Sequence, residues 1–248
     1  LRRALVLAHD RAAEIEIIRK GQAIPAHSPV APGVVGYDPA FRTDAQDYDP
    51  PKAKALLDMF GYVDRDGDGV REQPDGKPLL IRHKYNAGSQ EQRQLAELYV
   101  KSLADVGLRM EAQGVMFADM LKDKKVGNYM TATSAWIADY PDAQNFLQLL
   151  YGPNTGQSNE SAFRLAEYDR LYEKARVMPD SPERTKLYQQ MAKIAIAYAP
   201  WKINVHRILT DLWYPWVEGF RRTPMLGNHF WKYMDIDPAR QESQASGR

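Results

Sequence analysis

The stretch PLLIRHKYNAGSQEQRQLAELYVKSLADVGLRMEAQGV, residues 78–115, decides the fold class. Its first part, residues 78–85, has the length and the apolar start typical of a strand. Residues 90–106 predict a helix, because apolar side chains recur there every three or four positions. Residues 108–115 predict a second strand. A strand, a helix and a strand in this order indicate an α/β layer with helices packed on a sheet.

The same alternation continues downstream. FADMLKDKKVG, residues 117–127, predicts a short helix, and YMTATSAW, residues 129–136, predicts a third strand. Two more helices are expected at 166–178 and 182–199. The second of them has Ser181 as its N-cap and a proline at its first position, both favoured there. The later part of the chain is therefore expected to be largely helical.

Upstream of the sheet the pattern changes twice. LRRALVLAHDRAAEI, residues 1–15, predicts a helix, and Lys20-Gly21 is its predicted end. Residues 24–51 hold six prolines, which predicts a long irregular segment that is functional or wraps over another part of the protein. Because the helical pattern has already begun at residue 1 and no initiator Met precedes it, the chain is expected to be a fragment or a processed product.

Composition excludes several classes of function. The chain has 248 residues with 33 basic and 32 acidic side chains, so no net field would attract nucleic acid. Cysteine is absent, which excludes thiol catalysis, disulfides and cysteine-ligated metals. The longest aliphatic runs are far shorter than the roughly 20 residues of a membrane-spanning helix. No serine-hydrolase, P-loop or dinucleotide-binding signature is present, so the sequence predicts a protein that is not an enzyme.

Two patterns bear on metal binding. The five histidines are scattered without an HxxxH pair, so no zinc site is expected. DRDGDGVREQPD spaces Asp64, Asp66 and Asp68 as in a calcium loop, with Gly69 at the sixth position and Asp75 at the twelfth. The twelfth residue of such a loop is normally Glu, and a strand-like run follows here instead of a helix. The alternative is a tight turn whose carboxylates accept hydrogen bonds from their own backbone.

The segment AWIADYPDAQNF, residues 135–146, follows the third predicted strand and holds two acids among large aromatic side chains. Asp142 lies where the N-cap of the next helix belongs, so its predicted role is structural. Asp139 precedes a proline at the end of an apolar strand and is not the cap. Ligands of open α/β sheets bind beyond the carboxyl ends of the strands. Asp139 is therefore a candidate site residue, with a structural acid of the strand-to-helix turn as the alternative.

Five stretches, in order along the chain, resemble the C-terminal half of the peptide-binding (oligopeptide/dipeptide, with nickel-binding relatives) family of extracytoplasmic solute-binding proteins of ABC importers. LRRALVLAHDRAAEI resembles its helix with an Ala-x-Asp-Arg signature, and DYDPPKAKALLDMFGYVDRDGDGV its Asp-Pro-x-x-Ala segment and Asp-Gly-Asp-Gly turn. WIADYPDAQNFL resembles its Trp-x-x-Asp-Tyr segment. EYDRLYEKARVMPDSPERTKLYQQMAKI and the closing APW resemble its late helices.

This resemblance implies an α/β fold: a lobe like those of type II periplasmic-binding proteins, with a mixed sheet flanked by helices, in a fragment of a larger two-lobed protein. Residues 1–205 are expected to form the second, C-terminal ligand-binding lobe and 206–240 a return segment toward the first lobe. The polar residues 241–248 are expected to be a disordered tail. The implied function is a periplasmic solute-binding component that captures di- or oligopeptides for an ABC permease in the inner membrane. The other expected partner is the missing N-terminal lobe; neither nucleic acid nor a cofactor is expected.

The resemblance also implies ligand contacts. Asp139 matches the aspartate that pairs with the free α-amine of the ligand in peptide-binding members. The backbone around Ala135 and Ile137 is expected to bind the peptide as an added strand, and Trp136 and Tyr140 are expected to wall the pocket. Such main-chain contacts do not depend on the side chains of the peptide, so they tolerate many sequences.

Some features leave the ligand open. Ala143 stands where many members of the family have proline. Members of the family that bind nickel complexes or sugars share the same scaffold, and Asp139 could also pair with a cationic solute other than a peptide. The family carries the Asp-Gly-Asp-Gly turn without a role for calcium, which favours the structural interpretation of Asp64, Asp66 and Asp68. A calcium-stabilised structural module that binds no peptide is the alternative from a different class of function.

Overall fold

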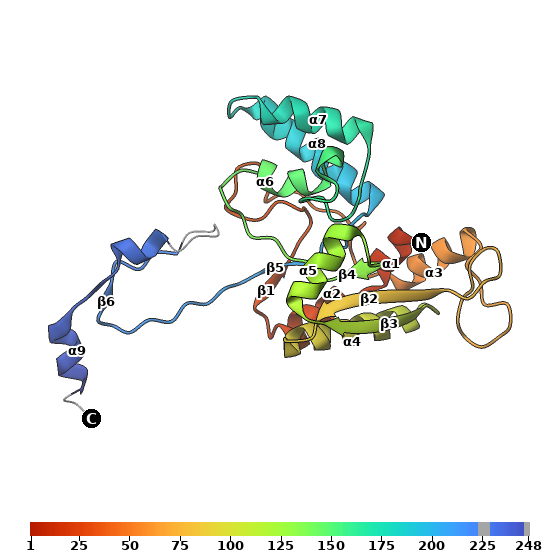
Figure 1. The fold of residues 1–248 in the computed structure, drawn as a ribbon, viewed down its shortest axis with the longest axis horizontal. Coiled ribbons are helices and arrows are strands. Elements are labelled where there is room, and N and C mark those ends of the chain that lie inside the picture. The colour runs from red at the N-terminus through yellow and green to blue at the C-terminus, as the bar shows by residue number, and fades with distance from the viewer. Residues whose placement is uncertain (223–228, 246–248) are drawn as a thin grey trace.

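A parallel three-stranded sheet organises the computed structural model, which describes residues 1–222 and 229–245. Its strands are β2 (Leu80–Asn86), β3 (Arg109–Val115) and β4 (Thr131–Ala132), in the spatial order β3-β2-β4 (Figure 1). β2 pairs with β3 along its whole length. The expected strand, helix and strand between residues 78 and 115 are therefore confirmed.

Two helices make the crossovers between the parallel strands, α4 (Gln90–Ala104) and α5 (Phe117–Val126). α4 begins at Ser89, whose hydroxyl accepts a hydrogen bond from a first-turn N–H at 3.3 Å. The fully buried Leu103 packs this helix into the core. α5 ends at Gly127, which adopts the left-handed conformation (φ 72°) that closes many helices.

The third strand is much shorter than predicted. Only Thr131 and Ala132 pair with β2, and the N–H of Thr133 makes one more hydrogen bond, to the carbonyl of Lys84 at 3.0 Å. Residues 134–137, which are mostly apolar, are exposed. Apolar side chains that face solvent produce the same sequence pattern as those of a buried strand. The segment after β4 is therefore a surface loop.

A first hydrophobic cluster packs α1 (Arg2–Ala8) and α3 (Pro50–Met59) against β2 and α4. α3 begins at Asp49, whose side chain accepts a hydrogen bond from the N–H of Lys52 at 3.0 Å. Prolines occupy the first positions of this helix, where a missing N–H costs nothing. The completely buried members of the cluster include Leu57 and Ile81.

The opening helix is interrupted where the sequence predicts continuity. α1 ends at Ala8, and Asp10 then caps a short turn, α2 (Arg11–Ala13), by accepting from the N–H of Ala13 at 2.9 Å. A π-helical turn, η1 (Glu14–Ile18), follows directly. The extended backbone of His9 between the two helices lets its buried ring stack on Tyr99, 4.0 Å away. This packing outweighs the helical pattern.

A second hydrophobic cluster joins the helices of residues 144–198, drawn above the sheet in Figure 1. Tyr168 and Met191 are fully buried there. The hydroxyl of Tyr168 donates to the carbonyl of Leu147 at 2.7 Å, so the buried phenol is satisfied. The elements are α6 (Gln144–Leu147), η2 (Gln148–Leu150), η3 (Gly152–Asn154), α7 (Ala166–Arg176) and α8 (Pro182–Tyr198).

The irregular segment predicted at 24–51 runs over this second cluster, with only the end of β1 (Ala23–Pro25) and the start of α3 as regular structure. Val35 bonds the turn after Asp139 at two points: its N–H donates to the Pro141 carbonyl at 3.1 Å, and its carbonyl accepts the Ala143 N–H at 2.9 Å. Proline at 143 would lose the second bond. The segment therefore fixes that turn, and it uses the N–H that alanine supplies.

Residues 208–222 and 229–245 extend away from both clusters as an arm (Figure 1). The arm leaves the body through β5 (Val205–Arg207), which pairs antiparallel with β1, so parallel and antiparallel pairs both occur. Its elements are β6 (Val217–Glu218), η4 (His229–Tyr233), β7 (Asp235–Ile236) and α9 (Pro238–Ala245). Its exposed large apolar side chains are Ile208, Leu209, Leu212, Trp213, Tyr214, Trp231, Tyr233 and Ile236.

Part of the tail predicted to be disordered, 241–248, is helical, because α9 runs to Ala245. The Asp237 carboxylate caps this helix and accepts from the N–H of Ala239 at 3.0 Å and of Arg240 at 3.3 Å. A capped polar helix has the same composition as a disordered tail, so composition alone does not separate the two. Residues 246–248 lie outside the described residues. No helix in the described ranges has the length and apolar character to cross a membrane.

Candidate ligand-binding site

Asp139 lies on the exposed loop that follows β4. Its backbone N–H donates to Asn145 Oδ1 at 3.1 Å, and its carboxylate Oδ2 accepts from Asn145 Nδ2 at 2.9 Å. The other carboxylate oxygen, Oδ1, has no hydrogen-bond partner among the described residues. The carboxylate is therefore held at one oxygen and open at the other.

The residue that holds this carboxylate, Asn145, is fully buried in the first turn of α6. Its Oδ1 also accepts the indole N–H of Trp136 at 2.8 Å. The sequence pattern does not predict this role, because a polar residue near the start of a helix is normally at the surface. The available signal was its place directly before Phe146 and Leu147, which carry the buried face of α6.

The loop presents apolar side chains and unpaired backbone beside Asp139. Trp136, Ile137 and Tyr140 are 43%, 42% and 40% exposed. Within the described part of the chain, the N–H and C=O groups of Ala135 and Ile137 make no backbone hydrogen bonds. The structure thus brings together a carboxylate, two aromatic rings and a short stretch of backbone without backbone partners among the described residues, all on one loop.

Asp142 is the structural acid of the same loop. Its Oδ1 accepts the N–H of Gln144, the first residue of α6, at 2.8 Å. The N-cap itself is Ala143, so Asp142 lies one position before the predicted cap, although it still binds the first N–H of the helix. The same oxygen accepts the hydroxyl of Tyr188 at 2.9 Å, and Oδ2 accepts from Arg184. Burial and this carboxylate raise the pKa of Tyr188, so the phenol remains a donor. Asp142 therefore ties the loop to the first N–H of α6 and to α8.

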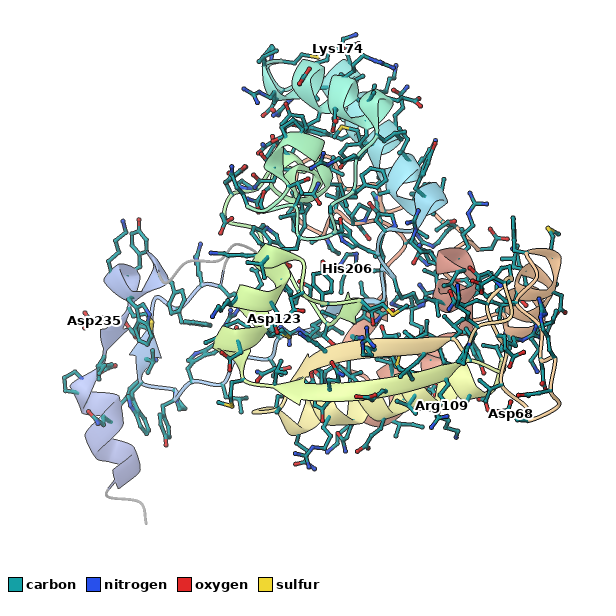
Figure 2. The ribbon with its side chains drawn as sticks, turned by 45° about the vertical axis from the view of Figure 1, so that its right-hand side comes forward. Asp68, Arg109, Asp123, Lys174, His206 and Asp235 are labelled. Atoms are coloured by element: carbon teal, nitrogen blue, oxygen red, sulfur yellow. The ribbon has the colours of Figure 1, made fainter. Side chains whose placement is uncertain are left out.

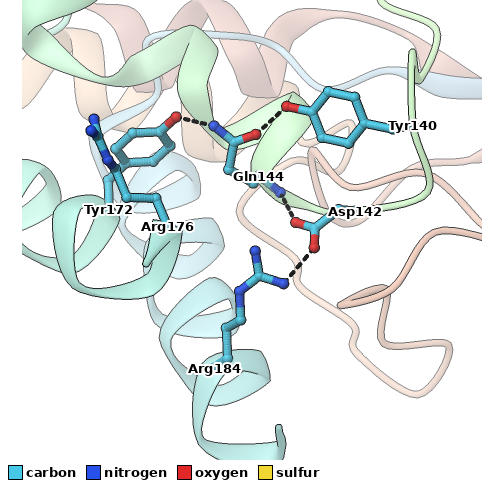
Figure 3. Close-up of a pocket in the computed structure, with 6 residues that line it drawn as sticks. All are labelled: Tyr140, Asp142, Gln144, Tyr172, Arg176 and Arg184. Carbon is cyan, nitrogen blue, oxygen red and sulfur yellow. Dashed lines mark hydrogen bonds and ion pairs between the residues drawn. The ribbon is translucent and has the colours of Figure 1, made fainter. Parts of the chain in front are cut away.

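A pocket of about 420 Å³ lies between α6, α7 and α8 (Figure 3). The hydroxyl of Tyr140 donates to the side-chain carbonyl of Gln144, whose amide donates in turn to the hydroxyl of Tyr172. Arg176 and Arg184 complete the lining together with Asp142. Trp136 and Asp139 do not line this pocket. The hydroxyl of Tyr140 therefore points to this pocket and not to the ligand pocket predicted beside Asp139.

The Asp-Gly-Asp-Gly turn gathers four carboxylates, those of Asp64, Asp66, Asp68 and Glu72, whose oxygens lie within 4.8 Å of one another. Asp64 already accepts backbone N–H groups at both oxygens, at 2.7 and 2.9 Å. Asp75 is not in the group and pairs with Lys77 at 2.7 Å. Figure 2 shows Asp68 on an outlying loop, at the opposite end of the molecule from Asp235 in the arm. The turn is thus remote from the arm, and its carboxylates bind their own backbone.

Within the described ranges, one group of side chains is close enough together to hold a metal ion, and it contains no histidine. Its members are Asp64, Asp66, Asp68 and Glu72. His83 hydrogen-bonds the hydroxyls of Thr131 and Thr133, at 2.9 and 3.1 Å, and so joins β2 to the start of the candidate loop. Burial lowers the pKa of His83 to about 4, so the ring is neutral at pH 7. The side chain of His229 lies outside the described residues.

Comparison with known proteins gives a family. The model for bacterial extracellular solute-binding proteins, family 5 (middle region), matches residues 1–158. The chain is 29% identical over 233 residues to di/tripeptide-binding protein 2 of Pseudomonas aeruginosa, covering 93% of this chain and 41% of that protein. It is 31% identical over 229 residues to heme-binding protein A of Haemophilus influenzae, covering 90% and 39%. The chain thus spans about two-fifths of the length of these curated relatives.

A solved structure shows the same fold. The oligopeptide-binding protein AppA of Bacillus subtilis, in complex with a nonapeptide, matches with a TM-score of 0.83 at 20% identity, over 95% of this chain and 47% of AppA. The predicted fold class, an α/β lobe of the type II periplasmic-binding kind, is thereby confirmed. Because the family model covers well over half of the residues and the fold agrees, the chain belongs to the bacterial extracellular solute-binding proteins, family 5.

Proposed function

We propose that this chain is part of the solute-binding component of an ABC importer, which captures di- or oligopeptides in the periplasm and delivers them to a permease in the inner membrane. The observation that carries the proposal is Asp139, an exposed carboxylate with one oxygen held by a buried side chain and the other open. The similarity to a di/tripeptide-binding protein supports a peptide as the solute. The role is that of a carrier rather than an enzyme.

The chemistry of the loop suits a peptide with a free N-terminus. The α-ammonium group donates up to three hydrogen bonds, and a carboxylate is the acceptor with which it forms the strongest pair. The backbone of Ala135 and Ile137, which makes no backbone hydrogen bonds to other described residues, offers hydrogen bonds to the peptide main chain, as in strand addition. The exposed ring of Trp136 packs against the ligand, and Tyr140 closes the same side with the part of its ring that remains exposed.

A second lobe, formed by polypeptide outside these residues, belongs to the same proposal. Residues 1–205 then form the C-terminal ligand-binding lobe, and 206–240 return toward the first lobe. The exposed apolar side chains of the arm support this arrangement, since Leu212 is 93% exposed and such a surface normally packs on another one. Closure of the two lobes on a peptide would exclude water around Asp139 and strengthen its interaction with the amine.

A titration of the full-length protein with a tripeptide and with its N-acetylated form tests the proposal. We expect saturable binding of the free-amine peptide, and at least about 100-fold weaker binding of the acetylated one, because acetylation removes the positive charge that meets Asp139. Intrinsic tryptophan fluorescence reports the binding of both peptides, since Trp136 and Asp139 hydrogen-bond the same side chain, Asn145. Equal binding of the two peptides would remove the amine from the recognition and leave family membership intact.

A non-peptide solute is the second candidate, because the chain is slightly more identical to heme-binding protein A than to the di/tripeptide-binding protein. An open carboxylate pairs with any suitable cation, so Asp139 could serve a nickel complex or another cationic solute, and a sugar could stack on Trp136. Failure of both peptides to bind in the titration, in protein with a normal melting temperature, would favour this candidate.

Calcium should not stabilise the protein measurably. Ligand at 100 times its Kd stabilises a folded protein by about 2.7 kcal/mol, which would raise the melting temperature by several degrees. We expect a change below about 1 °C between millimolar calcium and EDTA, because the Asp64 oxygens are already used by backbone N–H groups. Magnesium is the control. A rise of several degrees with calcium alone would support the calcium-stabilised module instead.

A further inference from the structure

Asn145 is a buried polar side chain that contacts both Trp136 and Asp139, the two side chains proposed to meet the ligand on this loop. We propose that Asn145 is a positioning residue, which orients the Asp139 carboxylate toward the ligand amine without touching the ligand itself. This inference rests on the proposed role of Asp139 in amine recognition. It adds a residue on α6, in the core, to a site otherwise made by the loop.

The orientation of the Asn145 amide is fixed by its neighbours. The indole N–H of Trp136, at 2.8 Å, and the backbone N–H of Asp139, at 3.1 Å, can only donate, so the amide oxygen must face them. The amide nitrogen then points the other way and donates to Asp139 Oδ2 at 2.9 Å. A flipped amide would set N–H against two N–H donors and an oxygen against the carboxylate. Three contacts thus agree on one geometry.

Asn145 is itself held in place, because it is fully buried in the first turn of α6. Its backbone N–H donates to the carbonyl of Asp142 at 3.0 Å. The two residues after it, Phe146 and Leu147, belong to the second hydrophobic cluster. The loop carboxylate is therefore anchored to the core through this single side chain.

The anchoring has a consequence for the ligand. With Oδ2 engaged by Asn145, the free Oδ1 is the oxygen that can accept from an amine, and its direction is set before the ligand arrives. A group already held in its bound orientation loses less conformational entropy on binding. Few side chains could replace Asn145: Asp would place an oxygen against the carboxylate, and Leu would leave two N–H donors without an acceptor.

A double-mutant cycle in the full-length protein tests the inference, with the free-amine tripeptide as ligand and calorimetry as the measurement. We expect Asn145→Ala to weaken binding about tenfold when Asp139 is present. When Asp139 has already been replaced by Ala, the same change should weaken binding less than about twofold, because Asn145 acts through that carboxylate. Gln157→Ala, which removes an exposed amide outside α6, is the control and should bind as wild type.

The outcomes separate the two proposals. An equal loss in both backgrounds would make Asn145 a structural residue and overturn the inference. Wild-type affinity in Asp139→Ala would instead reject amine recognition by Asp139 itself. If Asn145→Ala does not fold, side-chain ¹⁵N labelling of the wild-type protein decides: the Asn145 Nδ2 resonances should shift with the free-amine tripeptide and not with an equal concentration of the acetylated one. Resonances that stay unmoved at saturation would also overturn the inference.

Discussion

Asp139→Asn in the full-length protein should weaken the binding of a free-amine tripeptide about 100-fold, the cost typical of removing one partner from an enclosed charge pair. The new amide can turn its oxygen to Asn145 Nδ2, which leaves an NH₂ group where the open carboxylate oxygen was. The ammonium then meets a donor instead of an anion. Calorimetry with the tripeptide, at constant ionic strength, measures the change in Kd.

The same substitution should leave stability almost unchanged, because Asp139 is exposed and Asn can keep the hydrogen bond to Asn145. We expect the free energy of unfolding to change by less than about 0.5 kcal/mol. Asp119→Asn is a suitable control, since Asp119 is an exposed acid of the neighbouring helix α5 and carries the same change of charge. Wild-type affinity in Asp139→Asn, with the control also normal, would remove Asp139 from ligand binding.

The regular elements could be predicted where burial and hydrophobic spacing agree. β2, α4 and β3 follow from residues 78–115, and α8 follows from its cap at Ser181 and its apolar repeat, because one face of each element packs on the core. The prediction of the third strand was too long because burial and hydrophobicity disagree there. Residues 134–137 are mostly apolar but exposed, and a sequence does not tell an exposed apolar segment from an apolar face that packs on the core.

The site could be predicted only in part. The sequence does separate the two acids of the loop, because the start of the next helix explains Asp142 and leaves Asp139 unexplained. Asn145 could not be found in that way, since its three contacts depend on how the loop folds back over α6. The bonds between Val35 and the turn after Asp139 join residues about 100 positions apart, which no local pattern reports. Tertiary contacts, rather than propensity, therefore decide how the carboxylate is presented.

Asp139→Asn is expected to weaken binding and spare stability, whereas Asp142→Ala should destabilise the fold by about 3 kcal/mol. Loss of the hydrogen bond to the Gln144 N–H costs about 1 kcal/mol, and breaking a largely buried ion pair adds several kcal/mol, reduced here because Arg184 keeps its second partner, Asp180. The hydroxyl of Tyr188 also loses its acceptor. Urea unfolding followed by circular dichroism measures the change.

Asp142→Asn separates the parts of this effect. The amide oxygen can still accept from the Gln144 N–H and from Tyr188, so only the charge beside Arg184 is lost, and we expect about half the destabilisation. If Asp142→Ala were as stable as wild type, the pair of Arg184 with Asp180 would have to compensate for it fully, and Asp142 would contribute no net stability. With the expected values, two acids of one turn divide the work: Asp142 holds the loop on α6 and α8, and Asp139 is left free for the ligand.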